Sequence, residues 1–476
     1  MNKKIATITS VIIVLCAVTL AFWQQTGFAY FSGSYQSTWK PSPCTYIIDT
    51  NGTHFFMING ITGSMDYCST SASSVIQNAI GNISNIGRGG KIVFKNGNYT
   101  LTSSIDLTGV YSLSLEGETE PVYPPTDSGA RLTLTGLSNN YIIKKIEPFL
   151  GAHDGVTISN LYFYGTNIGI PASRALIYME NVSRIHVGNC VMSNSRSSAI
   201  ELNNSRWVWI EDNEIGIDNQ TNQGNTRDGI RADGVSPVWI SGNSMIGNEN
   251  GIHIKSNSAV SEDIHIFGNQ IVHNTAYGIL LEKGVYTLWL TEILGNSINE
   301  NGKDGICTTG QVTNCRISDN DIDDNSLTSS NSYDGIRLDG AANMTVWNNR
   351  LVALQGVQRY GITLCNVSWC WIEENNLNGN HQGAVNLEGT TTNLFVRHNG
   401  GFITENSGTA YYVADQGYIA HGLSSTPTSI IVASSVAGNI VSVTWKNSTH
   451  FRVAIKLSNG NPGTQEDIPW YVEYKP

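Results

Sequence analysis

Six ionisable side chains recur at matching places in a short repeated pattern. The heptapeptides DGIRADG (228–234) and DGIRLDG (334–340) differ at one position. Segments of this type can be aligned on their Gly-Ile pair, with side chains alternating between two faces as in a strand. One outward patch then collects Asp228, Arg231, Asp233, His253, Lys255 and Glu282. Carboxylates beside cationic groups could act as general acids and bases. The same alternation of charge also forms an exposed salt ladder, so both interpretations stay open.

These residues belong to a long internal repeat. An Asn closes the pattern apolar-x-x-Asn-x-apolar every 24 to 30 residues, at Asn213, Asn243, Asn269, Asn296, Asn320, Asn349, Asn375 and Asn399. A second mark, x-Gly-Ile or a close variant, occurs at Gly229, Gly251, Gly278, Gly305, Gly335, Gly361 and Gly383. Looser marks at Asn160 and Asn189 extend the series upstream. Because the two marks keep step, the two heptapeptides are predicted to be the same strand, four repeats apart.

Each repeat carries three short runs with apolar residues at every second position and without helical periodicity. Three strands in 22 to 30 residues fit one coil of a parallel β-helix, whereas leucine-rich repeats would need Leu at fixed offsets. Coils stack about 4.8 Å apart, which turns the apolar positions into inward columns. The Asn residues should then form a ladder of side-chain amides at one corner. Carboxylates two coils apart would lie about 9–10 Å from each other, near the upper limit used by inverting glycosidases.

Residues 151–402 resemble the right-handed β-helix, pectate-lyase-like superfamily through these two marks. The stretch 73–101 is also similar to the opening of such chains, with a helix at 73–83, a Gly-Gly turn at 89–90, a strand at 91–94 and Gly-x-Tyr at 97–99. The resemblance implies an all-β, single-stranded solenoid whose helix caps the open end. The superfamily holds lyases, hydrolases, epimerases, adhesins and inert surface proteins, so it leaves the function open.

Lyases of this superfamily use a base, often Arg or Lys, with Ca²⁺ to neutralise a uronate carboxylate. Arg231 and Lys255 could fill these roles beside Asp228 and Asp233. The motifs depart from the enzymes, however. NTRDGIR (225–231) resembles the Asn-Thr-Asp of polygalacturonases with Arg227 inserted, and VWIEDN (208–213) resembles the Trp-Ile-Asp-His of pectate lyases with Asn213 in place of His. These departures favour a binding or structural role over catalysis.

Two tryptophans offer a route to carbohydrate binding. Trp209 and Trp239 each stand four residues before a mark Asn, so strand alternation turns both outward, one above the other. Outward aromatic rings on a flat face could stack on sugar rings. A long loop covering the two rings is the alternative interpretation.

Two further clusters suggest bound ions or cross-links. Asp319, Asp321, Asp323 and Asp324 lie in SDNDIDDN (318–325), and alternation places several of them on one face, so Ca²⁺ could bind there. The segment has no Gly at the sixth position and no distal Glu, so it is not an EF-hand. Cys44 and Cys68 flank a segment ahead of the repeat, and an extracellular setting would allow a disulfide between them.

The chain divides into five predicted segments. Residues 1–29 start with two Lys and contain an apolar run at 5–23, which predicts a secretory signal or an N-terminal membrane anchor. Residues 30–72 form an N-terminal extension, 73–150 the capping helix and first coils, and 151–402 the β-helix. Residues 403–476 alternate strands with Ser, Gly and Pro turns, as in a small β-sandwich. Such a module could bind a glycan, cap the last coil or hold three chains together.

Composition narrows the function. Gly is abundant (48 residues), only 14% of residues are charged and 40% are hydrophobic, which is typical of an all-β protein with many tight turns. The net charge of −11 argues against nucleic acid as a partner. We therefore expect an extracellular or cell-surface protein that binds polysaccharide or forms part of a surface layer. The alternative is a polysaccharide lyase or glycoside hydrolase acting on a uronate-type polymer.

Overall fold

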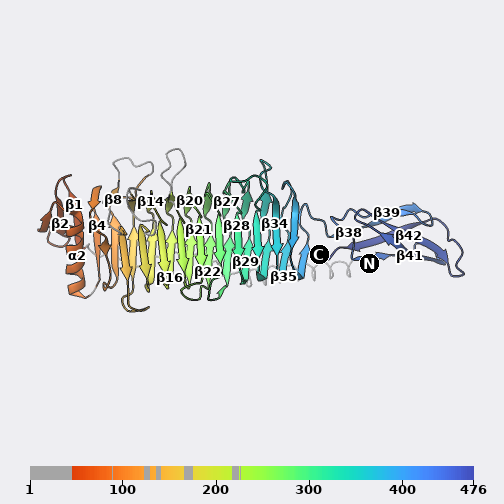
Figure 1. Ribbon diagram of the computed structural model, residues 1–476, viewed down its shortest axis with the longest axis horizontal. Helices are drawn as coiled ribbons and strands as arrows, with labels where there is room; N and C mark the ends of the chain where they lie inside the picture. Colours follow the sequence, from red (N-terminus) through yellow and green to blue (C-terminus); the bar gives the residue numbers. More distant parts are fainter. Residues whose placement is uncertain are drawn as a thin grey trace, which may run out of the picture. The chain divides into compact units, whose positions relative to one another are not determined.

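The computed structural model describes residues 45–87, 89–122, 129–135, 141–165, 175–216, 225 and 227–475. Residues in the repeat wind into a right-handed parallel β-solenoid in which each full coil adds one strand to each of three sheets. Figure 1 shows the strands of successive coils lying side by side. The predicted all-β β-helix with a helix near its N-terminus is therefore confirmed.

Sheet A has sixteen strands, in which β2 pairs antiparallel with β1 and with β3 and all other pairs are parallel. These strands are β1 (Tyr46–Thr50), β2 (Phe55–Asn59), β3 (Met65–Ser69), β4 (Gly90–Phe94), β7 (Leu113–Gly117), β10 (Val156–Ser159), β13 (Ser183–Gly188), β16 (Arg206–Glu211), β19 (Val238–Ser241), β22 (Ile264–Phe267), β25 (Leu288–Trp289), β26 (Thr291–Leu294), β29 (Val312–Ser318), β32 (Ala342–Trp347), β35 (Ser368–Glu373) and β37 (Thr392–Arg397).

Sheet B has ten strands and sheet C has eleven, and both are parallel throughout. The strands of sheet B are β5 (Gly97–Leu101), β8 (Ala130–Leu134), β11 (Leu161–Gly165), β14 (Val191–Ser193), β17 (Glu214–Gly216), β20 (Ser244–Ile246), β23 (Gln270–Val272), β27 (Ser297–Asn299), β30 (Asp321–Asp323) and β33 (Arg350–Val352). Those of sheet C are β6 (Ile105–Asp106), β9 (Ile143–Ile146), β12 (Ile177–Glu180), β15 (Ile200–Asn203), β18 (Ile230–Asp233), β21 (Ile252–Lys255), β24 (Ile279–Glu282), β28 (Ile306–Thr309), β31 (Ile336–Asp339), β34 (Tyr360–Cys365) and β36 (Gly383–Glu388).

The core consists of the three apolar columns predicted from the repeat. In one coil they are represented by Ile210 on sheet A, Ile215 on sheet B and Ile230 on sheet C, all fully buried. Each Ile buried in this way contributes about 1.5–3 kcal/mol of hydrophobic stabilisation. Strands β18 and β31, which carry the two heptapeptides, are separated by β21, β24 and β28 in sheet C. The heptapeptides are therefore the same strand four coils apart, as expected.

The predicted Asn ladder closes the corner between sheets A and B. From Asn213 to Asn399, each side-chain amide donates to the Oδ1 of the next Asn at 2.9–3.0 Å. The coils extend upstream as the marks at Asn160 and Asn189 predicted, but both residues stand one position before the ladder position, with left-handed φ angles of 56° and 52°. The equivalent ladder position is Cys190, whose backbone N–H donates to Asn213.

A second amide ladder, absent from the sequence expectations, runs along the corner between sheets B and C. It consists of Asn225, Asn248, Asn274, Asn301 and Asn325, whose side-chain amides are joined by hydrogen bonds of 2.9–3.0 Å. These residues are nearly or fully buried, so the bonds satisfy polar groups that water cannot reach. Both corners that flank sheet B are thus held by side chains in continuous register.

The N-terminal end of the solenoid is covered by a helix and a small meander. Helix α2 (Ala72–Ile86) starts at the N-cap Ser71 and ends at Gly87, which adopts a left-handed φ of 68°. Its face with Val75, Ile76 and Ile80 is buried in the main core, so the predicted capping role is confirmed. The stretch 46–69 is more ordered than an extension, because β1 to β3 prolong sheet A.

The C-terminal module contains two three-stranded antiparallel sheets. One is formed by β38 (Glu405–Val413), β43 (Glu466–Glu473) and β40 (Ser429–Val432), the other by β39 (Tyr418–Ala420), β42 (His450–Leu457) and β41 (Asn439–Lys446). Both sheets share a separate hydrophobic core that includes Phe451, Ile455 and Val472. The module is thus the small β-sandwich that alternation predicted.

Several expectations fall on residues 1–44, which lie outside the described part of the chain. They include the signal or anchor at 5–23 and one partner of the predicted disulfide, Cys44. Cys68 is half-buried on β3. Among the described residues, no helix is both long and apolar enough to cross a membrane.

Candidate functional site

Five of the six predicted ionisable residues converge on the outer face of sheet C. Strand register places Arg231 beside His253 and Lys255 beside Glu282. The Nε2 atom of His253 is 3.0 Å from a Glu282 carboxylate oxygen, and Lys255 Nζ is 3.0 Å from the other. Asp228, two residues before β18 begins, closes the group. We call these five residues, with Glu201, the sheet C cluster.

Asp228 is the buried anchor of this cluster. Its carboxylate accepts a hydrogen bond from Asn250 at 2.6 Å and lies 3.2 Å from His253 Nδ1 and 3.7 Å from Arg231. Burial alone would raise the pKa of Asp228, but the hydrogen bond from His253 and the neighbouring charges outweigh it and lower the pKa. Asp228 is therefore an ionised group held at the base of the cluster.

His253 links two carboxylates. One ring nitrogen faces Asp228 at 3.2 Å and the other faces Glu282 at 3.0 Å. Both hydrogen bonds can form together only when both nitrogens carry a proton. Burial acts to raise the pKa of Glu282, but Lys255 and His253 together outweigh it, and the pKa is lowered. Chemically, the arrangement is an imidazole between two carboxylates, with Lys255 beside the second, along which a proton could be held or passed.

Glu201 completes the cluster and was missed from the sequence. Glu201 on β15 pairs in register with Arg231 on β18, and its carboxylate is 3.9 Å from the guanidinium. Burial raises the pKa of Glu201 despite this neighbour. Its coil has Ser-Ala-Ile at 198–200 in place of x-Gly-Ile, so an alignment on Gly-Ile passes over it. Aligning Ile200 with Ile230, which fill the same inward column, would have revealed Glu201 as the residue beside Arg231.

Asp233 pairs with Lys255 in strand register, but among the described residues its side chain forms no hydrogen bond or ion pair with the cluster. Its Oδ1 atom instead accepts the backbone N–H groups of Asn257 at 2.7 Å and Ser258 at 2.9 Å. Ser258 Oγ also donates to the Asp233 carbonyl at 3.0 Å. Asp233 thus fixes the turn that follows β21, one coil further on.

The second heptapeptide lies in a network of its own, which sequence reasoning did not foresee. Asp334 is fully buried and accepts a two-pronged hydrogen bond from Arg359 at 2.9 and 2.8 Å. Arg337 is 3.7 Å from Asp334 and donates to Glu388 at 2.8 Å. Cys307 and Thr363 flank Arg337 in register, but its charged partners come from other positions.

Asp304 lies beneath this network. One of its oxygens accepts the backbone N–H of Asp334 at 2.6 Å. Burial is the main cause that raises the pKa of Asp304 to about 7, and the negative charge of Asp334 adds to it. A buried carboxyl group of this kind can carry a proton near neutral pH.

On sheet A, the two predicted tryptophans lie where alternation placed them. Trp209 and Trp239 are outward, half-buried and in direct register. Their rings stack at 5.0 Å and His265 continues the stack at 5.7 Å. Trp207, half exposed, lies 6.2 Å from Trp239. We call these four residues the aromatic surface, and their role in carbohydrate binding stays a prediction.

The four aspartates proposed for Ca²⁺ have other partners. Arg350 forms ion pairs with both Asp321 and Asp323. Asp319 accepts from Asn348 at 2.7 Å, and Asp324 accepts the backbone N–H of Gln355 at 2.7 Å. Within the described ranges, no group of three or more His, Cys, Asp and Glu side chains is arranged to hold a metal ion. Calcium binding by this segment stays a prediction that the observed pairing does not favour.

The chain is similar to one known protein family and to several solved structures of the same fold. Residues 149–322 and 285–400 match the family described as Right handed beta helix region. The A-module of mannuronan C-5 epimerase AlgE4 from Azotobacter vinelandii is similar over 69% of this chain and 95% of its own, at 13% identity and a TM-score of 0.54. For the AlgE6 A-module of the same organism the coverages are again 69% and 95%, at 17% identity and a TM-score of 0.50.

A third similar structure is the Dettilon tailspike protein, with coverages of 86% and 91%, 14% identity and a TM-score of 0.46. No curated protein matches the chain significantly in sequence. Identities this low concern the fold alone. Because the family match covers more than half of the chain, the protein belongs to the right-handed β-helix family.

Proposed function

We propose that this protein binds polysaccharide along the outer face of sheet A. The observation that carries the proposal is the aromatic surface, in which three stacked rings and the half-exposed Trp207 occupy adjacent coils. Rings held in this way offer rigid apolar surface beside polar strand edges, which suits the mixed apolar and hydroxyl faces of sugars. The stack needs no ordering when a ligand arrives, so little conformational entropy is lost on binding.

A second pair of rings supports a polymer as the ligand. Trp371 and Phe395 stack at 5.4 Å on the same outward column of sheet A, and Trp369 beside them is half exposed. Trp239 and Trp371 are five coils apart, which corresponds to about 24 Å. An extended chain of sugars could contact both groups of rings, whereas a small ligand could contact only one.

The comparisons support the same class of ligand without naming it for this chain. Two structures with this fold are modules of enzymes named for their action on mannuronan, a polysaccharide. We further propose that the protein acts outside the cytoplasm, since the apolar run at 5–23 follows a basic start. The C-terminal module could hold three chains together, which sedimentation of the full chain would test.

The test is a binding titration of the full chain against neutral and acidic polysaccharides. Trp239→Ala removes the centre of the stack, and we expect affinity for the bound polymer to fall about tenfold. Trp445→Ala is the matched control, because Trp445 is a partly exposed tryptophan in the C-terminal module. Equal affinity of the wild type and Trp239→Ala, with both folded, would rule out this surface as the binding site.

A second candidate function is turnover of the polysaccharide on the sheet C cluster. The observation that favours it is His253 bridging a buried, ionised Asp228 and Glu282 beside Lys255. Such a chain could take or deliver a proton at a sugar ring. Incubation with a panel of uronate polymers, followed by the absorbance of unsaturated products and by reducing ends, tests this activity. An activity that survives His253→Gln would exclude the cluster as its site.

A further inference from the structure

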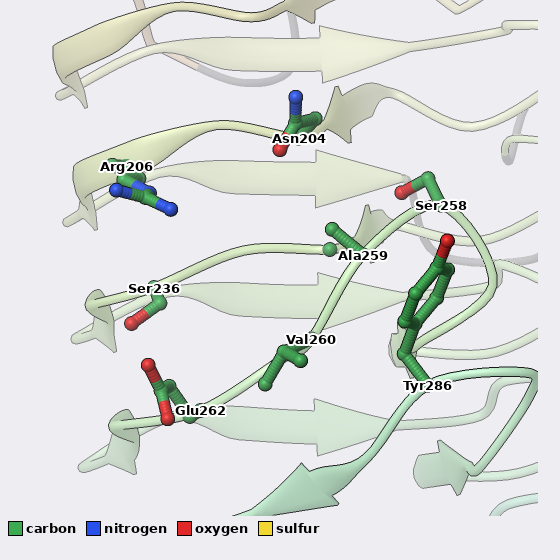
Figure 2. A pocket seen from close by; sticks show the side chains of 9 residues that line it. Asn204, Arg206, Ser236, Ser258, Ala259, Val260, Glu262 and Tyr286 are labelled. Atoms are coloured by element: carbon green, nitrogen blue, oxygen red, sulfur yellow. The ribbon is translucent and has the colours of Figure 1, made fainter. Parts of the chain in front are cut away.

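A cavity of about 270 Å³ lies at the corner where the chain passes from sheet C to sheet A. Successive coils contribute to it, from the turn after β15 to the turn after β24. Figure 2 shows Arg206 and Glu262 on one side and the ring of Tyr286 on the other, with the segment from Ser258 to Glu262 between them. None of the six ionisable residues first predicted from the sequence lines this cavity.

The wall of the cavity is preorganised. Residues 256–263 form a longer turn than 234–237 in the preceding coil. Asp233 holds this turn through the backbone N–H groups of Asn257 and Ser258, and Glu262 N donates to the Val235 carbonyl at 3.1 Å. Tyr286 N donates to the Ser256 carbonyl at 2.8 Å. The contacts to Asp233 therefore make it a positioning residue for the cavity.

The lining combines opposite charges that do not neutralise each other. Among the described residues, neither the Arg206 guanidinium nor the Glu262 carboxylate has a hydrogen-bond or ion-pair partner, and both line the cavity. An anionic ligand would be attracted by Arg206 but repelled by Glu262, and a cationic ligand would meet the reverse. A neutral ligand with hydroxyl groups can accept from Arg206 and donate to Glu262 at once.

The remaining lining fits a sugar ring. Tyr286 is 46% exposed and Val260 is 39% exposed, so both offer apolar surface to the cavity. Ser236 and Ser258 add hydroxyl groups. Arg206 is followed directly by Trp207, so one wall of the cavity adjoins the aromatic surface along the chain.

We propose that this cavity binds one neutral sugar ring through neighbouring hydroxyl groups, as a side branch or terminal residue of the polysaccharide. The inference rests on the proposed function for its polymer, but the cavity alone determines the preference for an uncharged sugar. Arg206 donates to one hydroxyl, Glu262 accepts from another, and Tyr286 packs against the apolar face of the ring.

The experiment uses ligand-observed NMR on the full chain with the methyl glycosides of glucose, galactose and mannose. Glucuronic acid and glucosamine at pH 7 are the charged comparisons. We expect at least one neutral glycoside to bind and the two charged sugars to bind more weakly. Arg206→Gln and Glu262→Gln should each weaken the neutral glycoside by roughly tenfold or more. Arg397→Gln, an exposed arginine elsewhere on sheet A, should leave binding unchanged.

The outcomes separate this inference from the proposed function. Trp239→Ala should weaken the polymer but leave the small glycoside bound, because the ring of Trp239 does not line the cavity. Polymer binding without any glycoside binding at millimolar concentration would overturn the cavity inference alone. Preference for a charged sugar, or indifference to both Arg206→Gln and Glu262→Gln, would overturn it as well. Glycoside binding without polymer binding would instead remove the proposed function.

Discussion

The indole rings of Trp209 and Trp239 lie 5.0 Å apart and within 7° of parallel on the outer face of sheet A. They are thirty residues apart in sequence, and direct strand register brings them together. Each ring covers part of its neighbour, so both rings are half-buried although they lie on the outer face. The surface that they form is thus a product of the solenoid repeat, and a single coil could not provide it.

Trp207 holds an unusual backbone conformation for a bulky residue. Its φ is 55°, in the left-handed region, whereas Asn314, Asn343 and Asn393 occupy the same corner of other coils at similar angles. Asn tolerates this region better, and the strain for other residues is about 1–2 kcal/mol. We expect Trp207→Asn to keep or raise stability by about 1 kcal/mol while polysaccharide affinity falls.

Denaturant unfolding and polysaccharide titration of Trp207→Asn measure the two effects separately. Asn314→Ser serves as the control, because it changes the same corner away from both groups of outward rings. A variant that loses stability but binds normally would mean that the Trp207 ring serves packing only.

The histidine at the end of the stack should make stability depend on pH. A hydrogen bond to Glu292, followed by one to Asp263, raises the pKa of His265. A raised pKa stabilises the folded state fully below the ordinary value of about 6.5, and the contribution is lost as pH rises through the folded pKa. The effect should stay under about 1 kcal/mol because the pair is partly exposed.

Thermal melting of wild type and His265→Gln between pH 5 and pH 9 gives this dependence as a difference, in which the other histidines cancel. The difference should be largest at the acidic end and shrink toward pH 9. A constant difference across the range would show that the ring packs on Trp239 without a charge-dependent contribution.

The repeating part of the fold was predictable because it depends on local patterns. Inward positions such as Ile215 and Ile271 follow from strand alternation, and the ladder Asn follows from one residue at each corner. The second ladder left a signal too, since Asn248, Asn274 and Asn301 stand three or four residues before the Gly of each x-Gly-Ile mark. The first Asn ladder and the x-Gly-Ile mark already establish the period of the repeat, so the period does not by itself reveal the second Asn ladder.

The side-chain networks could not be predicted in the same way. Arg337 binds Glu388, which is 51 residues away and two strands further along sheet C. Long side chains reach past their register neighbours, so alignment of columns does not identify their partners. Asp233 illustrates the converse case, because it belongs to the right column but turns toward backbone N–H groups.

An ion pair buried inside the first coils offers a sharper test of stability. Lys145 occupies an inward position in register with Met179, and both Lys145 and Glu147 have fully buried side chains. Lys145 Nζ is 2.8 Å from Glu147 and also donates to the carbonyls of Leu107 and Val110. Glu147→Gln leaves a buried ammonium group without its counter-charge, so we expect a loss of about 3–5 kcal/mol.

The adjacent Lys144 provides the control, because it forms a half-exposed pair with Asp106 at 2.9 Å. Lys144→Met should cost less than about 1 kcal/mol. The double variant Lys145→Met with Glu147→Gln removes the stranded charge and should recover part of the loss. Chemical denaturation of the full chain measures all three, and a small effect of Glu147→Gln would mean that water reaches the pair.

The last prediction concerns Asp304, below the second heptapeptide. Burial, aided by the charge of Asp334, raises the pKa of Asp304 to about 7, whereas an unfolded Asp has a pKa of about 3.9. Between these values the folded state holds a proton that the unfolded state has released, so stability falls as pH rises from about 4 to 7. Asp304→Asn keeps the oxygen that accepts the Asp334 N–H but cannot ionise. The stability of the variant should therefore match that of the wild type near pH 4 and exceed it by up to a few kcal/mol at pH 8.

Asp334→Asn is the matched control and should be destabilising at pH 8, because it weakens the two-pronged hydrogen bond from Arg359. Urea unfolding at pH 4, 6 and 8 follows both variants. If Asp304→Asn were less stable than the wild type at pH 8, the ionised carboxylate would have to be held by favourable contacts, such as those with the guanidinium groups of Arg337 and Arg359.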